Sequence, residues 1–289
     1  FNDHRGKDDD AAETLEENEH LEDRLTSTEA EFQEQETEYA EVDVDPIKME
    51  VDMDEIVSAE ELTELAELTN IPVTTTMAGK GGIDERHPLS LGSSSIVMNG
   101  AVRHYMLNSD TVLAVGTSLT KHGMITTIPD GKKIIHAVND TKDIGNYYDP
   151  EIGLLGDAKL VLNQLIEACK DLITSQNGRL SPEDEIKHLK EAWLQDWDKK
   201  LNSSETPMTP YRVIGEFMNV VDPSQTIVTH DSGSPRDQIM PFYTSGGPGT
   251  YLGWGKSHGL GTGLGLNIGA KLASQYKFDD NFLSFFQPS

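Results

Sequence analysis

The chain has 289 residues, enough for one large or two ordinary domains, and a formal net charge of −27. Residues 1–57 hold 22 acidic and 4 basic side chains, so the rest of the chain is only mildly acidic. This charge disfavours binding to nucleic-acid phosphates, and the lack of any apolar run of 18 residues argues against a membrane protein.

The single cysteine, Cys169, cannot form an internal disulfide, and no signal-like N-terminus is present. Both features indicate a reducing, cytoplasmic location. Residues 1–45 contain few apolar side chains and no sustained period. Such a segment cannot bury enough surface to offset its conformational entropy. We therefore predict that residues 1–57 form an acidic, disordered tail.

Strands alternate with helices over residues 58–175. The first helix is predicted at Ser58–Leu68, with Ser58 as its cap, and it leads into a buried strand at Ile71–Thr76. Further helices are predicted at Met98–Leu107 and Asp157–Ile173, and further strands at Thr111–Gly116, Lys132–Val138 and Ile152–Leu155. Nearly continuous apolar strands that alternate with helices are typical of a parallel sheet covered on both faces. The sequence thus predicts a Rossmann-like α/β domain at 58–175.

A linker follows at 176–206 and contains an amphipathic helix, Pro182–Leu201. Trp193 and Trp197 lie four residues apart on this helix, and we expect them to pack it on a neighbour. A second α/β unit is predicted at 207–289, with a helix at Tyr211–Val221, a strand at Gln225–Thr229 and a helix at Gly265–Ala273. The last helix should lead into another strand, but the closing segment QYKFDDNFLSFFQPS does not read as one. We therefore expect this unit to be incomplete.

Two glycine-rich strings carry most of the functional information. The first, IPVTTTMAGKGGIDERHPLSLG, runs from the strand at Ile71 into Gly79–Gly82, whose bare backbone could lie close to a ligand. His87 and Pro88 then form a rigid bend, in which we expect His87 to be structural. Loops at the carboxyl ends of strands build the binding crevices of open α/β sheets.

The second string, YLGWGKSHGLGTGLGLNIGAKLAS, runs from Tyr251 to Ser274. Its residues alone allow two interpretations. Gly263, Gly265 and Gly269 approximate a dinucleotide-binding turn, although that fingerprint should follow a strand directly. The glycines could instead permit close helix packing.

Together the two strings resemble the thiamine diphosphate-dependent 2-oxo acid enzymes, above all the acetolactate synthase family, over roughly residues 60–275. The resemblance implies that 58–175 is the central domain and that 207–289 begins the diphosphate-binding domain. It implies thiamine diphosphate and Mg²⁺ as cofactors and a 2-oxo acid as substrate. The complete enzyme would be a homo-oligomer, either a dimer or a tetramer. Carboligase (transferase) and decarboxylase (lyase) activities both remain open.

The resemblance also points to individual cofactor-binding residues. The segment Thr229–Ser234 occupies the place of the family's diphosphate turn, and the contacts with the diphosphate fall on Gly233 and Ser234. The family's next glycine-rich segment binds the aminopyrimidine ring and places a bulky apolar residue beneath the thiamine. By position these roles fall on His258, Gly259 and Leu260.

Two parts of the family pattern are not found in this sequence. The catalytic glutamate lies in a pyrimidine-binding domain, and nothing before Ser58 resembles that domain. The Gly-Asp-Gly…Asn motif that holds Mg²⁺ should follow Ala273 and is missing. We therefore expect no catalytic or metal-binding residue in this fragment and no activity from it alone. The alternative is a non-catalytic nucleotide-binding or regulatory module with an acidic tail.

The central domain of acetolactate synthases holds FAD, and that of some relatives holds ADP. The corresponding loops here are Thr76–Gly79, Val97–Gly100 and Gly116–Ser118. The arginines common in flavin-binding members are missing, and Val138 stands where an acidic strand end is expected. We therefore expect an empty, structural central domain.

The histidines offer no independent catalytic pattern. His230 and Asp231 are neighbours, but adjacent strand residues point to opposite faces and cannot relay a proton along one line. No histidine shows metal-ligand spacing with carboxylates or with other histidines.

Overall fold

The computed structural model describes residues 58–121, 127–173, 181–253 and 259–274, and the backbone of 282–285. The chain divides into two compact units, Phe1–Asp52 and Met53–Ser289, and every described residue belongs to the second. The predicted disordered tail, the linker residues 174–180 and His258 lie outside the described residues.

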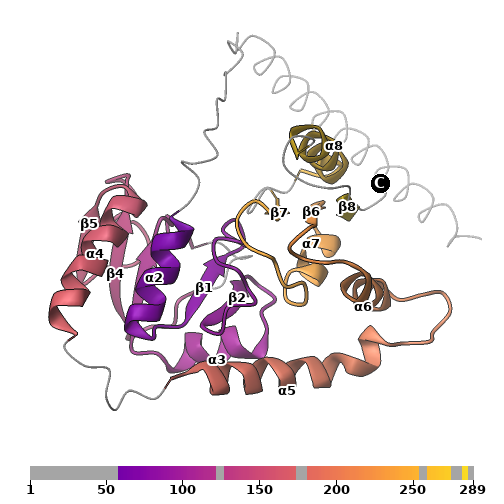
Figure 1. Ribbon diagram of the computed structural model, residues 1–289, viewed down its shortest axis with the longest axis horizontal. Helices are drawn as coiled ribbons and strands as arrows, with labels where there is room; N and C mark the ends of the chain where they lie inside the picture. Colours follow the sequence, from indigo (N-terminus) through magenta and orange to yellow (C-terminus); the bar gives the residue numbers. More distant parts are fainter. Residues whose placement is uncertain (1–57, 122–126, 174–180, 254–258, 275–281, 286–289) are drawn as a thin grey trace, which may run out of the picture. The chain divides into compact units, whose positions relative to one another are not determined.

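The first half of the described chain has the predicted parallel α/β architecture (Figure 1). Strands β1 (Val73–Thr76) and β2 (Ser90–Ser94) pair in parallel. Strands β3 (Thr111–Val115), β4 (Lys133–Val138) and β5 (Ile152–Leu155) form a second parallel sheet in that order. Helices α2 (Ala59–Thr69), α3 (Gly100–Asn108) and α4 (Ala158–Leu172) alternate with them. The α/β, Rossmann-like fold class is confirmed.

The sequence does not predict strand β2. Its sequence, SLGSS, consists mainly of serine and glycine, which are poor strand formers and read as a loop. The segment is nevertheless buried over four of its five residues and pairs with β1. Tertiary burial therefore overrides local preference here.

Helices α2 and α4 pack on each other through Leu65, Leu162 and Ile166. The start of α4 follows expectation, since Asp157 accepts a hydrogen bond from the Leu160 N–H at 3.0 Å. The predicted cap of α2 is wrong, because the Ser58 side chain makes no capping hydrogen bond. The backbone of Ser58 does not adopt the extended conformation that directs a hydroxyl at the first turn.

The second half begins with the long helix α5 (Glu183–Leu201), followed by α6 (Pro210–Val220). Strand β6 (Ile227–His230) is central in a parallel sheet of order β7–β6–β8, where β7 is Tyr251–Leu252 and β8 is Phe282–Phe285. The short helix α7 (Ser234–Ile239) follows β6, and α8 (Thr262–Ser274) packs on β6 and β8.

Strand β8 corrects the expectation that no strand follows the last helix. Its Cα atoms pair with β6 from Ile227↔Phe282 to His230↔Phe285. The strand, FLSF, is only four residues long, is interrupted by a serine and is preceded by Asp279, Asp280 and Asn281, so the sequence reads as irregular chain. The pairing partner that turns it into a strand lies more than 50 residues earlier.

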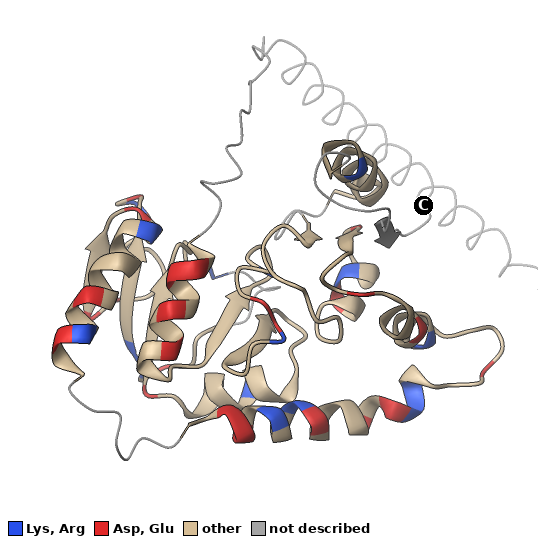
Figure 2. Cartoon of the chain, in the orientation of Figure 1, with Lys and Arg blue, Asp and Glu red and all other residues tan. Residues whose placement is uncertain are grey.

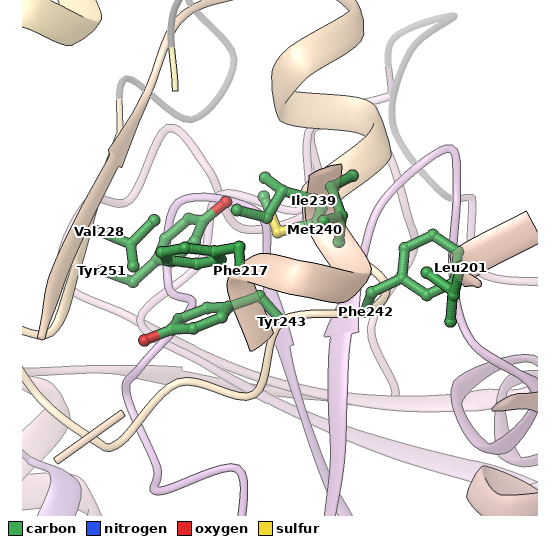
Figure 3. Close-up of a cluster of buried hydrophobic side chains, with 9 residues drawn as sticks. Leu201, Phe217, Val228, Ile239, Met240, Phe242, Tyr243 and Tyr251 are labelled. Carbon is green, nitrogen blue, oxygen red and sulfur yellow. The ribbon is translucent and has the colours of Figure 1, made fainter. Parts of the chain in front are cut away.

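The main core of the second half is a cluster of nine buried apolar side chains, shown in Figure 3. Aromatic rings pack against this cluster. The ring centroids of Trp193 and Phe242 lie 4.7 Å apart, and those of Trp197 and Tyr211 lie 5.1 Å apart. The expectation that the two tryptophans pack their helix on a neighbour is confirmed.

The glycine loop that follows β1 packs against this chain's own backbone. A Cβ on Gly81 would lie 2.9 Å from the Gly247 carbonyl oxygen, and the Gly81 φ is +90°. Both facts require glycine for a close approach between two backbone segments. At Gly81 this close backbone packing accounts for the glycine.

A buried polar network surrounds this contact. Lys80 and Glu85 form an ion pair at 2.5 Å, with their side chains 1% and 4% exposed. The other carboxylate oxygen accepts from the Ser93 hydroxyl at 2.8 Å, and the Ser245 N–H donates to the oxygen paired with Lys80 at 2.9 Å. Burial lowers the pKa of Lys80, and Glu85 opposes that shift. Glu85 thus joins the loop after β1 to the segment after α7.

Candidate functional site

The turn between β6 and α7 is the segment predicted to meet a diphosphate. Gly233 has φ 78° and ψ −143°, a conformation that L side chains rarely adopt, and it directly precedes α7. Ser234 is the first residue of α7 and is exposed. The turn therefore presents a backbone without a side chain next to a solvent-facing hydroxyl.

The carboxylate of Asp231 connects this turn to the second predicted cofactor segment. Its Oδ1 accepts from the Ser232 N–H at 2.9 Å, and its Oδ2 accepts from the Gly261 N–H at 2.8 Å. Asp231 is 0% exposed. One buried side chain thus bonds to backbone segments that are 30 residues apart.

The start of α8 packs directly on the end of β6. A Cβ on Gly263 would lie 2.9 Å from the Asp231 nitrogen and 3.0 Å from the His230 carbonyl carbon. The Thr229 hydroxyl donates to the Gly263 carbonyl oxygen at 3.0 Å. Close helix packing accounts for Gly263, as the second interpretation of the glycine string expects.

Gly259 and Leu260 lie in the loop just before α8, and both are exposed. The Leu260 side chain is 63% exposed. Because Gly261 is bonded to Asp231, this loop lies at the same end of β6 as Gly233 and Ser234. Four of the five predicted cofactor residues are described, and they occupy two adjoining segments.

His230 faces a different set of partners from Asp231. Its Nδ1–H donates to the Asp231 carbonyl oxygen at 3.0 Å, and its ring lies 5.3 Å from that of Tyr251. Gly253 approaches the other edge of the ring so closely that a Cβ there would overlap it. Burial lowers the pKa of His230. The ring thus bonds to the backbone of Asp231 while the Asp231 carboxylate bonds to other N–H groups, which agrees with the argument against a proton relay.

Two features near the turn carry no signal in the sequence. Arg236, on α7, is 1% exposed, and its Nε–H donates to Asp237 at 2.9 Å. A cavity of about 220 Å³ lies beside Ser234, with aromatic walls from Trp197, Tyr211 and Phe242 and polar groups from Asp237 and Gln238. Both arise from packing between elements distant in the sequence, so neither residue type nor spacing could have revealed them.

The loops corresponding to the family's flavin site have structural contacts of their own. The His136 Nε2–H donates to the Thr117 carbonyl oxygen at 2.8 Å, which holds the loop after β3. A Cβ on Gly100 would meet the Trp193 Cβ at 3.2 Å, so the start of α3 packs closely on α5.

His87 is held in the bend before Pro88, as expected. Its Nε2 lies 3.2 Å from the Glu67 carboxylate, and its Nδ1 accepts a hydrogen bond from the Leu89 N–H.

The residues at the end of β6 fit the backbone requirements of a bound diphosphate cofactor. Gly233 and Gly261 both have positive φ, no atom of the described residues lies within 4 Å of the position that a Cβ on Gly261 would take, and Ser234 is exposed. Within the described ranges, no group of three or more His, Cys, Asp or Glu residues could hold a metal ion. Over those ranges, no helix is both long enough and apolar enough to cross a bilayer.

Comparisons with known proteins bear on the family of the chain. Residues 49–165 match the family model of the thiamine pyrophosphate enzyme central domain. The chain is 30% identical over 227 residues to a probable acetolactate synthase large subunit of Methanococcus aeolicus, and 32% identical over 227 residues to one of Methanocaldococcus jannaschii. It is 28% identical over 224 residues to an acetolactate synthase of Mycobacterium avium.

These matches cover 74%, 76% and 74% of this chain, respectively, and therefore extend beyond the central domain. The chain spans 37% of the length of each archaeal relative and 34% of the mycobacterial one. The chain belongs to the acetolactate synthase-like family of thiamine diphosphate-dependent enzymes.

Proposed function

We propose that this chain supplies the central domain and the diphosphate side of a thiamine diphosphate site in an acetolactate synthase-like enzyme. The observation that carries the proposal is the junction at the end of β6. There, Asp231 bonds to both the turn before Gly233 and the loop after Leu260. A cofactor with a diphosphate at one end and an aromatic ring system at the other needs two such segments side by side.

In this proposal each segment has a separate role. The Gly233 backbone lets a diphosphate approach closely, and the Ser234 hydroxyl donates a hydrogen bond to it. The exposed Leu260 side chain supports the thiamine ring, and the backbone beside Gly259 binds the pyrimidine. His258 belongs to the same proposal but lies outside the described residues. Bound thiamine diphosphate would supply a nucleophilic ylid carbon for attack on the carbonyl of a 2-oxo acid and a thiazolium ring that accepts the electron pair released with CO₂.

The charge of the diphosphate requires compensation in the complete protein. Arg236, a buried cation on α7, is already bonded to Asp237 and is 1% exposed. A divalent cation such as Mg²⁺ would lower the repulsion between the diphosphate and nearby carboxylates. Mg²⁺, the 2-oxo acid substrate and association with further subunits all belong to the proposal, as does the inactivity of the chain alone.

Calorimetry with thiamine diphosphate in magnesium buffer tests the proposal. We expect at most weak binding to the wild-type chain, which carries only part of the site in this proposal, and loss of that binding in Gly233→Val. A Val side chain at Gly233 would occupy the ligand's path and would strain a backbone with positive φ. Gly131→Val is a matched control, because Gly131 also has positive φ, has no described atom within 4 Å of its Cβ position and lies in the loop before β4.

The second candidate is a nucleotide-binding or regulatory module. The parallel strands β3 and β4 favour it, since loops at their carboxyl ends are the usual nucleotide sites of open α/β sheets. The same calorimetry with ADP and FAD separates the two. Binding of either nucleotide without binding of thiamine diphosphate would reject the first proposal in favour of the second.

A further inference from the structure

The carboxylate of Asp231 is held by backbone donors on both sides. Ser232 N–H donates to Oδ1 from within the turn after β6, and Gly261 N–H donates to Oδ2 from the loop before α8. Asp231 is 0% exposed, so its charge is removed from water. A buried carboxylate needs such donors, and hydrogen bonds to an ionised group are stronger than those between neutral groups.

We propose that Asp231 is a positioning residue that sets the separation between the diphosphate turn and the loop 259–261. This inference rests on the proposed function, because it assigns the two segments to the two ends of one cofactor. Asp231 does not itself bind the diphosphate. Two negative groups repel each other, and both carboxylate oxygens accept from backbone N–H groups of this chain.

The surrounding contacts separate this role from one of simply holding the fold together. The hydrogen bond from Thr229 to Gly263 and the close packing of Gly263 on β6 also hold α8 against the strand. The bond from Gly261 N–H to Asp231 fixes the position of the loop that precedes α8. Weakening that bond should therefore shift the loop while α8 stays in place.

The substitution Asp231→Asn is the sharpest probe. Asparagine has almost the same shape, but one of its two terminal groups is an NH₂ donor that cannot accept from a backbone N–H. The variant therefore keeps one acceptor and loses the other. Asp222→Asn is the matched control, because Asp222 also accepts from a backbone N–H, that of Ser224, in an exposed turn before β6.

The experiment compares two probes by calorimetry in magnesium buffer: thiamine diphosphate, which needs both segments, and inorganic pyrophosphate, which needs only the turn. We expect the wild-type chain to bind thiamine diphosphate more tightly. In Asp231→Asn that preference should fall by about tenfold or more, which corresponds to one lost charge-assisted hydrogen bond, while pyrophosphate binding changes little. Asp222→Asn should keep the wild-type preference.

Amide hydrogen exchange gives a readout that needs no cofactor. The Gly261 N–H should exchange faster in Asp231→Asn than in the wild type, and the N–H of Ala270 in the middle of α8 should not.

If Asp231→Asn weakened the binding of thiamine diphosphate and of pyrophosphate equally, the positioning role would be overturned, because equal weakening indicates general damage to the fold. An unchanged preference would also overturn it while leaving the proposed function intact. If the wild-type chain did not prefer thiamine diphosphate over pyrophosphate, the proposed function and this inference would both be overturned. The wild-type measurement alone shows that result, before any variant is made.

Discussion

At the scale of single residues, substitutions at two of the three glycines of α8, Gly263 and Gly269, test directly how the helix packs on β6. A Cβ at Gly263 would meet backbone atoms of His230 and Asp231, which cannot move independently of the strand. Gly263→Ala should therefore lower the free energy of unfolding by about 1–3 kcal/mol, the usual cost of overpacking.

Gly269→Ala should instead raise the free energy of unfolding, because no atom of the described residues lies within 4 Å of its Cβ position. Alanine in a helix interior is favoured over glycine by about 0.5–1 kcal/mol. Urea denaturation of both variants measures the difference. Similar free energies of unfolding for the two would show that α8 does not rest on β6 at Gly263.

Tyr251 gives a test of buried hydrogen bonding. Among the described residues, its hydroxyl oxygen is one of the buried polar atoms without a hydrogen-bond partner. Burial, with a smaller contribution from Glu85, raises the pKa of Tyr251 well above its usual range. Tyr251→Phe removes the unsatisfied hydroxyl, so at pH 7 we expect stability to change by less than about 1 kcal/mol.

The same substitution should change the response to alkaline pH. The folded-state pKa of Tyr251 is raised above the unfolded value of about 10, so only the unfolded chain ionises this group as the pH passes 10. The stability that this pKa difference contributes is fully present below pH 10 and is lost as the pH rises toward the folded-state pKa of Tyr251. Thermal unfolding between pH 8 and 11 should show a shallower decline in Tyr251→Phe, whereas Tyr147→Phe, at an exposed site, should match the wild type.

The predicted site residues come from the family resemblance, which assigns the diphosphate contacts to Gly233 and Ser234. The structure has β6 and α7 on either side of these two residues. The role of Asp231 depends on Gly261, 30 residues later, and no local pattern carries that information. Cofactor binding by any of these residues stays a prediction.

At the scale of elements, the buried pair of Lys80 and Glu85 connects parts of the chain that are far apart in sequence. Glu85 accepts from the Ser245 N–H at 2.9 Å and donates its own N–H to the Ser245 carbonyl oxygen at 3.0 Å. Lys190 of α5 donates to the Glu85 carbonyl oxygen at 3.3 Å. The loop after β1, helix α5 and the segment after α7 therefore meet at one residue.

Glu85→Gln should cost about 3–5 kcal/mol, because it leaves the Lys80 ammonium buried without its counter-charge. The matched control is Asp84→Asn, one residue away, where the pair with Arg86 is exposed and should contribute less than about 1 kcal/mol. Urea denaturation measures both. Adding Lys80→Met to Glu85→Gln should recover part of the loss, and the lack of any recovery would contradict an ion-pair origin.

The elements that the sequence predicted correctly are those with strong local patterns. Apolar β-branched runs located β3, β4 and β5 to within a residue at each end, and apolar periodicity located α4, α5 and α6 equally closely. The three strands that it missed, β2, β7 and β8, depend on partners elsewhere: β2 is a serine-rich segment buried beside β1, and β7 and β8 are runs of two and four residues that both pair with β6. Long-range pairing is the information that a single sequence does not display.

At the scale of the whole molecule, charge is distributed unevenly over the described elements. Figure 2 shows acidic positions on α2 and both acidic and basic positions on α4 and α5, whereas α8 carries only Lys271 and no acidic residue. An acidic chain can still accept an anionic ligand where local carboxylates are few. The exposed part of the junction at the end of β6 fits that condition, since Asp231 there is buried and bonded to backbone donors.

The most direct test of the central claim locates the ligand on the chain. The protein is labelled with ¹⁵N-glycine and titrated with thiamine diphosphate in magnesium buffer, and amide signals are followed by NMR. We predict saturable shifts at Gly233, Gly259 and Gly261, with Gly131 and Gly145 in distant loops unchanged. Shifts confined to Gly79, Gly100 and Gly116 in the central domain, or no saturable shift at any glycine, would contradict a thiamine diphosphate site at the end of β6.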